Sequence, residues 1–410
     1  MNDSLFSQTY TIRGMTGGPV GPLLGGYVAF LQQHRYSVDT IQHSLRAACV
    51  FSRWLEQEHI PLGEVSEDVL TRYRDRFRRK RKKPLLPAEV TGLPKLLTWL
   101  RVQGLVPLSA RPNDNEQEKW LNRFDDHLVS VHGISDSTRW KYRACASRFV
   151  GNLFGKRAPD WGAITADRIR DFVATDSRQH HAEQTVCALR AALRFLIAEN
   201  HIPAHLLGAA PSFPRFRPEG IPCHLSRDEV HRVIAVCHDK TALGLRDAAI
   251  ISLLARMGLR AGEVSRLGLD DIDWVEGRLL IRAGKTKRER VLPLPNEVGR
   301  CIVRYLKRAR PLTDHRSLFI RHIAPFTCLS PFTISWIAAC RLKQASIQAE
   351  RFGSHIFRHS AATQMVRRGA AFKDVADVLG HQRLQTTNIY AKLDLGNLLQ
   401  VALPWPGGEQ

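Results

Sequence analysis

A proline-rich stretch divides the chain and limits how it can fold. Four prolines lie between residues 211 and 222, and Arg215 and Arg217 are interleaved with them. Proline fixes its own φ angle and has no backbone N–H, so this stretch cannot continue a helix and favours an extended chain. The sequence therefore predicts a linker over 211–222 that separates the first half of the chain from a further domain over 223–403.

Two segments before the linker are similar to each other. Each predicts a helix, then a Ser/Thr-rich helix start, then a second helix with aromatic residues at helical spacing, such as Phe51 and Phe149. Each continues with a short similar segment, 65–73 in one and 164–172 in the other. We expect two all-helical modules, 1–110 and 115–210, whose aromatic residues form their cores.

The region after the linker predicts a mainly helical domain with one small antiparallel sheet. Ser226 and Glu229 have the spacing of a capping box at a helix start. Strands are expected at 278–283 and 289–294, on either side of a basic turn. The expected helices, two of which end at Gly369 and Gly380, cover 245–257, 262–267, 296–308, 331–346, 357–368 and 372–379.

The charge of the chain points to a polyanionic partner. Sixty Lys and Arg against 39 Asp and Glu give a formal charge of +21, with a pI near 10.1. Nucleic acid is the first expectation, because each neutralised phosphate releases counterions, and an anionic membrane surface is the second. No stretch reaches the roughly 18 to 20 apolar residues of a spanning helix. The N-terminus does not resemble a signal peptide, so we expect a cytoplasmic protein without a membrane partner.

A basic run lies in the first module. Residues 72–83 hold nine Lys and Arg and one acid, Asp75. Such a run can be a solvated helix end or a flexible arm. With the charge of the whole chain, it favours contact with the DNA backbone, which positions a protein without reading sequence.

The eight cysteines do not predict a metal site. They are scattered and form no C-x-x-C pair, which argues against a zinc ribbon. We expect all eight to be buried, reduced thiols in the core.

Six residues of the last domain fall at predicted helix ends or turns, where they could gather around one phosphate. Taken singly, each has an ordinary structural explanation, such as a solvated arginine after a helix or a packed tyrosine. Their order and spacing make the set significant. They are Arg260, Lys285, His355, Arg358, His381 and Tyr390.

The segment from about Leu225 to Asp394 resembles the catalytic domain of the tyrosine recombinase (phage integrase) family. Four motifs of that family match in order, with Arg288 where many members have lysine. The matching residues are Gly258, Leu259, Arg260 and Glu263; Gly284, Lys285, Glu289, Arg290, Pro293 and Leu294; His355, Ile356, Phe357, Arg358 and His359; and Leu379, Gly380, His381, Thr386, Thr387, Ile389 and Tyr390.

The resemblance assigns the phosphate-binding roles, and the residue types suit them. Arg260 and Arg358 would stabilise the charge that gathers on the phosphate oxygens in the transition state, because a guanidinium can hold two oxygens at once. His381 would donate to the same oxygens. Glu263 would orient the cationic groups rather than react.

The resemblance also assigns the groups that move protons. Tyr390 would be the nucleophile, and its phenol, with an ordinary pKa of about 10, needs activation by its surroundings. His355 would be its base. Lys285, in the hairpin turn, would be the general acid that protonates the leaving 5′-oxygen.

The implied reaction is site-specific recombination of double-stranded DNA through a 3′-phosphotyrosyl intermediate. The intermediate keeps the ester energy, so no cofactor or metal is expected, and the sequence lacks a complete P-loop or H-E-x-x-H motif. A homo- or hetero-multimer, a tetramer on DNA, is the expected assembly. The alternatives are a type IB-like topoisomerase acting as a monomer and a catalytically silent DNA-binding regulator.

The parts outside the catalytic segment resemble the family more loosely. Residues 120–202 resemble its helical core-binding domain, which would contact DNA. The first module could be a second core-binding-like unit, an arm-site binder or a protein-contact module. The apolar tail, Leu393 to Leu403, could pack on a neighbouring protomer or on its own domain.

Overall fold

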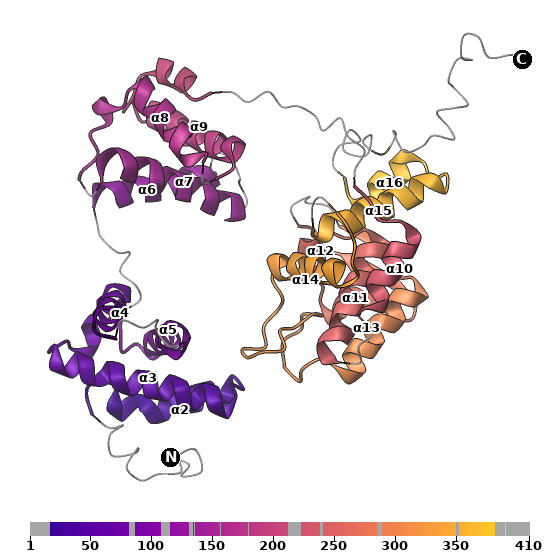
Figure 1. Cartoon of the computed structure of the whole chain (residues 1–410), viewed down its shortest axis with the longest axis horizontal. Helices are drawn as coiled ribbons and strands as arrows, with labels where there is room; N and C mark the ends of the chain where they lie inside the picture. Colours follow the sequence, from indigo (N-terminus) through magenta and orange to yellow (C-terminus); the bar gives the residue numbers. More distant parts are fainter. Residues whose placement is uncertain are drawn as a thin grey trace, which may run out of the picture. The chain divides into compact units, whose positions relative to one another are not determined.

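The computed structural model in Figure 1 divides the chain into two compact units, one of residues 1–56, 86–96 and 219–410 and one of residues 57–85 and 97–218. It describes residues 17–81, 87–107, 115–130, 134, 136–155, 157–178, 180–211, 223–237, 241–284, 289–349, 352–381 and 390. Most of the predicted linker and the tail from Leu393 to Leu403 lie outside these residues. The predicted module boundaries remain predictions.

The first described stretch is helical, as expected. Its helices are α2 (Leu24–Gln33), α3 (Val38–Gln57), α4 (Glu67–Arg81) and α5 (Pro87–Val102), with short 3-10 turns η2 (Gly21–Leu23) and η3 (Leu62–Glu64). Tyr27 is buried on α2, and its hydroxyl donates to the carbonyl oxygen of Gly92 on α5 at 3.2 Å. Phe51 and Trp54 are buried on α3.

The second helical stretch builds a core of its own. It consists of α6 (Glu116–Ser130), α7 (Asp136–Phe154), η4 (Trp161–Ala163), α8 (Ala166–Asp176), α9 (Ala182–Ala198) and η5 (Ala204–Ala209). Trp120 and Phe124, one helical turn apart on α6, stack with ring centroids 5.6 Å apart. Phe149 and Phe172 pack edge to face in the same core. The expected core role of the aromatic residues is confirmed here.

The region after the linker is mainly helical. Its helices are α10 (Arg227–Ala235), α11 (Ala242–Met257), α12 (Ala261–Arg266), α13 (Asn296–Arg308), α14 (Pro331–Gln344), α15 (Ser354–Arg367) and α16 (Phe372–Leu379), with one 3-10 turn, η6 (Leu269–Asp271). The predicted capping box is present, because Ser226 and Glu229 each bond the other's backbone N–H. Helix α16 ends as predicted, with Gly380 in the left-handed conformation.

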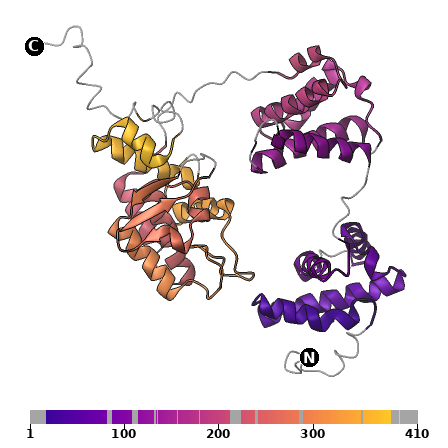
Figure 2. The ribbon, with the colours of Figure 1, turned by 180° about the vertical axis from the view of Figure 1, so that it is seen from behind.

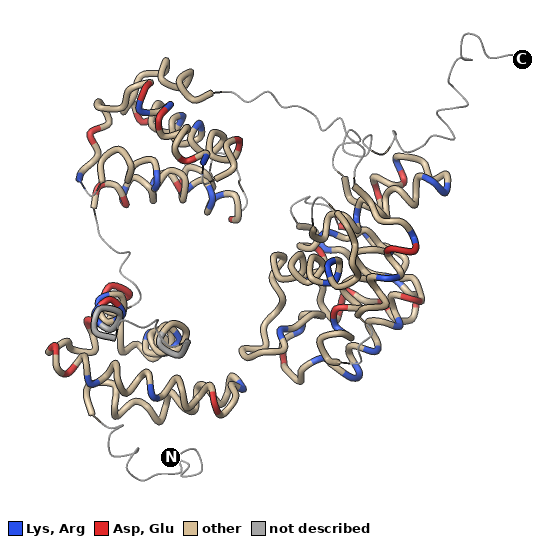
Figure 3. Tube along the Cα trace, viewed as in Figure 1, with Lys and Arg blue, Asp and Glu red and all other residues tan. Residues whose placement is uncertain are grey.

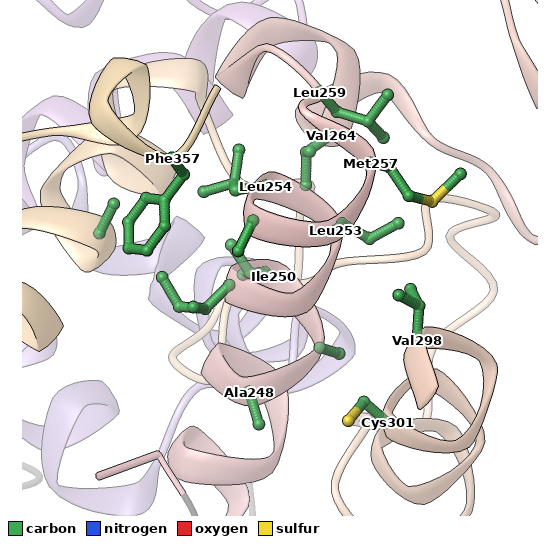
Figure 4. Close-up of a cluster of buried hydrophobic side chains, with 14 of the residues drawn as sticks. Ala248, Ile250, Leu253, Leu254, Met257, Leu259, Val264, Val298, Cys301 and Phe357 are labelled. Carbon is green, nitrogen blue, oxygen red and sulfur yellow. The ribbon is translucent and has the colours of Figure 1, made fainter. Parts of the chain in front are cut away.

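Helix α11 forms the centre of this region. It is buried on nearly all sides and packs against α13 and α15. Figure 4 shows Leu253 and Leu254 of α11 between Phe357 of α15 and the α13 residues Val298 and Cys301. Because α11 is fixed from several directions, the loop at its end holds Arg260 in a defined place.

The sheet is small and antiparallel, in the order β1 (Ile272–Asp273), β2 (Arg278–Ile281) and β3 (Arg290–Pro293). Leu279 of β2 pairs with Leu292 of β3, and both side chains are buried. The predicted fold class is confirmed. The sequence missed β1, because two residues are too few to show a strand period. Figure 2 shows the sheet from behind.

Helix α15 begins earlier than predicted. It starts at Ser354 rather than Phe357, so His355 lies in the first turn of the helix instead of the loop before it. The same helix therefore presents His355, Arg358 and His359 within its first turns.

The expectation that all eight cysteines are buried was wrong for four. Cys187, Cys223 and Cys328 are exposed, and Cys340 is partly buried. The others are buried, and all eight are free thiols. Cysteine is small enough to lie at the surface without cost, so a count of cysteines does not predict burial.

None of the described helices combines the length and the apolar character that a membrane crossing requires.

Candidate active site

Arg260 is positioned by the turn between α11 and α12. Gly258 ends α11 with φ +63°, and an added Cβ there would lie 2.7 Å from the side chain of Leu379, so glycine is needed. The chain then turns, and Arg260 becomes the N-cap of α12. Glu263, one turn later, accepts from the backbone N–H of Arg260 at 2.9 Å and from its Nη1 at 3.1 Å.

Arg290 reaches the same carboxylate from β3. Its Nη1 and Nη2 donate to the two oxygens of Glu263 at 3.1 Å each, and its Nε donates to the carbonyl oxygen of Val378 at 2.9 Å. Burial raises the pKa of Glu263, but the hydrogen bonds and charge of Arg290, with those of Arg260, outweigh it and hold the pKa below its usual value. Glu263 is thus an anion shared by two arginines.

Arg358 of α15 completes a cluster of three guanidinium groups. Its side chain is buried, and it donates to the carbonyl oxygens of Gly258 at 2.8 Å and Leu379 at 2.5 Å. Arg260 also donates, at 3.3 Å, to the carbonyl oxygens of Leu379 and Gly380. The arginines therefore meet at the carboxyl end of α16, where unpaired carbonyls carry partial negative charge.

Gly380 allows this convergence. Its φ of +63° and the closeness of Arg290, whose Nη1 would lie 2.7 Å from an added Cβ, leave no room for a side chain. His381 follows at once, and its backbone N–H donates to the carbonyl oxygen of Ala376 at 2.9 Å. His381 is thereby held at the end of α16, beside the carbonyls that the arginines bind.

The cluster lowers the pKa of the groups around it. Burial and the charge of Arg260 lower the pKa of Arg358 to about 10, so it stays charged at neutral pH. Burial, followed by Arg358 and Arg260, lowers the pKa of His381 to about 4. The pKa of His355 is lowered by the same three causes. Neutral histidines beside fixed cations make a site that favours an anion.

Tyr390 lies beside this site, enclosed by apolar side chains. It is 1% exposed and packs with Ala362, Val366 and Leu379. Its hydroxyl is 2.8 Å from Nδ1 of His359. Burial raises the pKa of Tyr390 to about 12, although Arg358 and Arg260 act in the opposite direction. The phenol is therefore protonated at neutral pH.

The structure brings Arg260, Glu263, Arg358 and His381 together with Tyr390. His355 lies one turn before His359 on α15, with part of its side chain exposed. Lys285 lies outside the described residues. Within the part of the chain that the structure describes, no group of three or more His, Cys, Asp and Glu side chains could hold a metal ion.

Two contributors were not recognised from the sequence. Arg290 and His359 were quoted there only as letters of the matching motifs. The contact of Arg290 with Glu263 spans 27 residues, and the contact of His359 with Tyr390 spans 31. Hydrophobic periodicity carries no signal of such contacts.

Two protein-family models match separate regions of the chain. The model described as "Phage integrase family" matches residues 224–395, and the model described as "Phage integrase, N-terminal SAM-like domain" matches residues 121–200. A protein of Sinorhizobium fredii named as an integrase/recombinase is 34% identical over 400 residues, which are 96% of each chain. The chain belongs to the phage integrase family.

Further relatives agree with this membership. A tyrosine recombinase XerC of Ralstonia nicotianae is 31% identical over 266 residues, 62% of this chain and 70% of that protein. Among solved structures, the XerH recombinase bound to difH DNA after cleavage has a TM-score of 0.55 at 17% identity, over 72% of this chain and 98% of that chain. A lambda integrase dimer on a core site has a TM-score of 0.51 at 19% identity, over 71% and 98%. These structures show the shared fold.

This family member is a tyrosine-type site-specific DNA recombinase. The recombinase relatives do not favour the topoisomerase alternative. The silent-regulator alternative is not favoured either, since Arg260, Arg358 and Tyr390 are all present at the site.

The electrostatic field of the arginine cluster acts on the pKa of His381. Replacing Arg260→Gln should raise the pKa of His381 above about 4, because Arg260 is one of the cations that disfavour the protonated imidazole. NMR titration of the His381 ring measures this directly. Arg316→Gln, which changes an exposed arginine paired with Asp270, is the control and should leave the pKa of His381 where it is. An unchanged pKa in Arg260→Gln would show that Arg260 does not act on this site.

Proposed function

We propose that this recombinase integrates, excises or transposes DNA segments by cutting and rejoining duplex DNA through a 3′-phosphotyrosyl bond on Tyr390. The observation that carries the proposal is the meeting of three guanidinium groups beside a buried tyrosine. A phosphodiester repels nucleophiles through its own charge, and fixed cations are the main means of overcoming that repulsion.

Arg260 and Arg358 are the proposed phosphate ligands. Arg358 is held by two carbonyls and is buried, while 28% of the Arg260 side chain remains exposed. A phosphate would approach from the exposed side of Arg260. Glu263 and Arg290 would keep Arg260 in place, and His381, neutral in the free protein, would donate to a phosphate oxygen.

In the proposed step, the oxygen of Tyr390 forms a bond to phosphorus and the bond from phosphorus to the 5′-oxygen breaks. The phenol loses its proton to a base, and the leaving 5′-oxygen gains one. Lys285 is the proposed donor, on the family resemblance. The phosphotyrosyl ester keeps the bond energy, so attack by the 5′-hydroxyl of another strand rejoins the DNA and releases Tyr390.

Two histidines compete for the role of base. The family resemblance assigns it to His355. The geometry favours His359, which lies within hydrogen-bond distance of the tyrosine hydroxyl and is kept neutral because burial, followed by His355 and Arg358, lowers its pKa. A neutral imidazole nitrogen can accept the phenol proton, so we assign the first proton transfer to His359 and contact with the phosphate to His355.

The second helical stretch is the proposed core-binding domain. A hollow in its surface lies between α7 and the start of α9, and Trp140 at its edge is 71% exposed. Basic and imidazole groups line this hollow together with Glu183, and Arg148 among them is paired with Asp176. Lysine and arginine beside an exposed aromatic ring suit a nucleic-acid surface. The basic and imidazole groups are Lys141, Arg148, Arg178, His180 and His181.

We also propose that four chains assemble on DNA and exchange their apolar tails. An open apolar hollow in the catalytic region is lined by residues that include Met257, Leu292 and Val375. The tail from Leu393 to Leu403 is apolar enough to fill it on a neighbouring chain.

Free thiols at all eight cysteines fit a reducing compartment, and the cytoplasm is the proposed location.

The nucleophile is tested by trapping. Incubation with nicked suicide DNA that carries the cognate site, without Mg²⁺, should give a covalent adduct that moves more slowly on a denaturing gel. Tyr390→Phe should abolish the adduct while duplex binding is retained, because only the hydroxyl is removed. No adduct on cognate DNA with intact binding would contradict the assignment of Tyr390.

The base is tested by comparing two variants in the same assay. We expect His359→Gln to slow adduct formation by about 100-fold or more, within the usual range for a general base, and His355→Gln to slow it less. Glutamine keeps a polar amide of similar size but cannot take the proton. If His355→Gln shows the larger loss, His355 is the base and His359 only holds the resting tyrosine.

The assembly is tested by replacing two leucines of the tail. Leu398→Asp with Leu399→Asp should reduce the native mass of the protein–DNA complex below four chains, because a charged tail does not enter an apolar hollow. Adduct formation on a single site should persist in this variant. A complex of unchanged mass would show that the tail does not hold the chains together.

A further inference from the structure

The first helical stretch has the same sequence of elements as the second. The order α2, α3, η3, α4, α5 is repeated as α6, α7, η4, α8, α9, with a 3-10 turn at the same point of each stretch. Figure 1 labels both sets of helices. Four helices alone are a common arrangement, but the turns and the cores of the two stretches also match.

The segment around the third helix is built in the same way in both stretches. Val65 and Ile164 are buried, and the next residue, Ser66 or Thr165, accepts from the backbone N–H three positions later, at 3.5 and 3.4 Å. The spacing between matching positions is constant. The first stretch has Gly63, Val65, Ser66, Leu70 and Tyr73 where the second has Gly162, Ile164, Thr165, Ile169 and Phe172.

The end of the fourth helix is also the same. Gly104 and Asn200 have φ of +69° and +58°, and the following N–H donates back to the carbonyl oxygen of Leu100 at 3.0 Å and of Leu196 at 2.9 Å. This is the hydrogen-bond pattern of a Schellman C-cap. A buried Val106 or Ile202 and then a proline follow in each case.

The buried positions coincide along all four helices. Each position is under 9% exposed in both stretches, and the matching pairs keep a constant spacing within each helix. These pairs are Leu24 and Leu121, Tyr27 and Phe124, Leu31 and Leu128, Ala48 and Ala146, Phe51 and Phe149, Leu70 and Ile169, Leu93 and Leu189, Leu97 and Leu193, Trp99 and Phe195, and Leu100 and Leu196.

We propose that residues 21–107 are a second copy of the SAM-like module and give the chain a second contact with the DNA backbone, in addition to the one proposed for residues 115–211. This proposal rests on the proposed function, since it takes the substrate to be duplex DNA. The family model for the SAM-like domain covers only residues 121–200, so it does not assign the first copy.

The first copy has a larger excess of positive charge than the second, which suits contact with the DNA backbone. Residues 17–107 hold 14 Lys and Arg against eight Asp and Glu, while residues 115–211 hold 13 against 11. Figure 3 shows both signs interspersed along α6 to α9. The excess in the first copy comes from the basic run at 72–83.

The position of that run within the copy is informative. By the spacing of the third helices, the start of the run corresponds to residues 171–176 at the end of α8. The rest of the run precedes the fourth helix in the sequence, as do Arg178, His180 and His181 of the second copy, which border the hollow beside α7. On the opposite border, His43 corresponds to Lys141, and both are exposed. In the sequence, the run therefore overlaps the segment whose counterpart lines the proposed DNA surface of the second copy.

The test measures the salt dependence of duplex binding by the full chain. Anisotropy of a fluorescent random-sequence duplex is titrated between about 50 and 200 mM salt, where each lost phosphate contact lowers the slope of log K against log salt by about 0.9. The variant is Arg72→Gln with Arg78→Gln, Arg79→Gln and Lys80→Gln. The expected result is a slope reduced by about 3 to 4.

Two further variants separate the causes. Replacing the four exposed cations of α13 (Arg300, Arg304, Lys307 and Arg308) by glutamine removes the same charge elsewhere and should change the slope much less. A third variant keeps the charge of the run by exchanging each residue for the other basic type: Arg72→Lys, Arg78→Lys, Arg79→Lys and Lys80→Arg. Its salt slope should equal that of the wild type. Failure of that exchange to preserve the slope would show that the effect is structural and would overturn the proposal.

The decisive outcome is independent of catalysis. If the glutamine variant of the run keeps the wild-type slope while wild-type protein still forms its Tyr390 adduct, the first copy does not bind DNA and the proposal is overturned. If the wild type forms no adduct, the proposed function fails, whereas a reduced slope still supports a second DNA contact.

Discussion

The candidate active site depends on the sharing of one buried carboxylate by two arginines. Arg290 and Arg260 both donate to Glu263, and Arg290, Arg260 and Arg358 donate to successive carbonyls at the end of α16. Without an anion among them, three nearby guanidinium groups would repel one another strongly in a region with little water. Glu263 and the helix end together offset that repulsion, and the remaining positive charge is available for a phosphate.

The same arrangement explains the protonation states around the site. Fixed cations and burial keep His355, His359 and His381 neutral, and burial keeps Tyr390 protonated. A phosphate bound among the arginines would offset part of this field, because its negative charge raises the pKa of the histidines and favours their protonated forms. The free protein therefore has a positively charged site that can bind an anion before the reaction begins.

The first half of the chain contains the same set of structural features twice. Both copies use a 3-10 turn, a buried aliphatic residue and a hydroxyl N-cap before the third helix, and a left-handed residue after the fourth. A module repeated with its core kept and its surface charge increased is well suited to holding a longer length of the same polyanion. This would let a recombinase bind its DNA more tightly without altering the catalytic region.

The sequence by itself determined the fold class, the order of the catalytic motifs and most of the elements, although it missed β1 and placed the start of α15 too late. Capping boxes, helix stops, prolines and motif spacing are local signals that can be read without a structure. Ser226, Gly380 and the hairpin strands were predicted on that basis. Contacts that join distant segments were decided only by the tertiary structure. The contacts of Arg290 with Glu263 and of His359 with Tyr390 depend on how β3, α12, α15 and Tyr390 are brought together, and no local pattern encodes that packing.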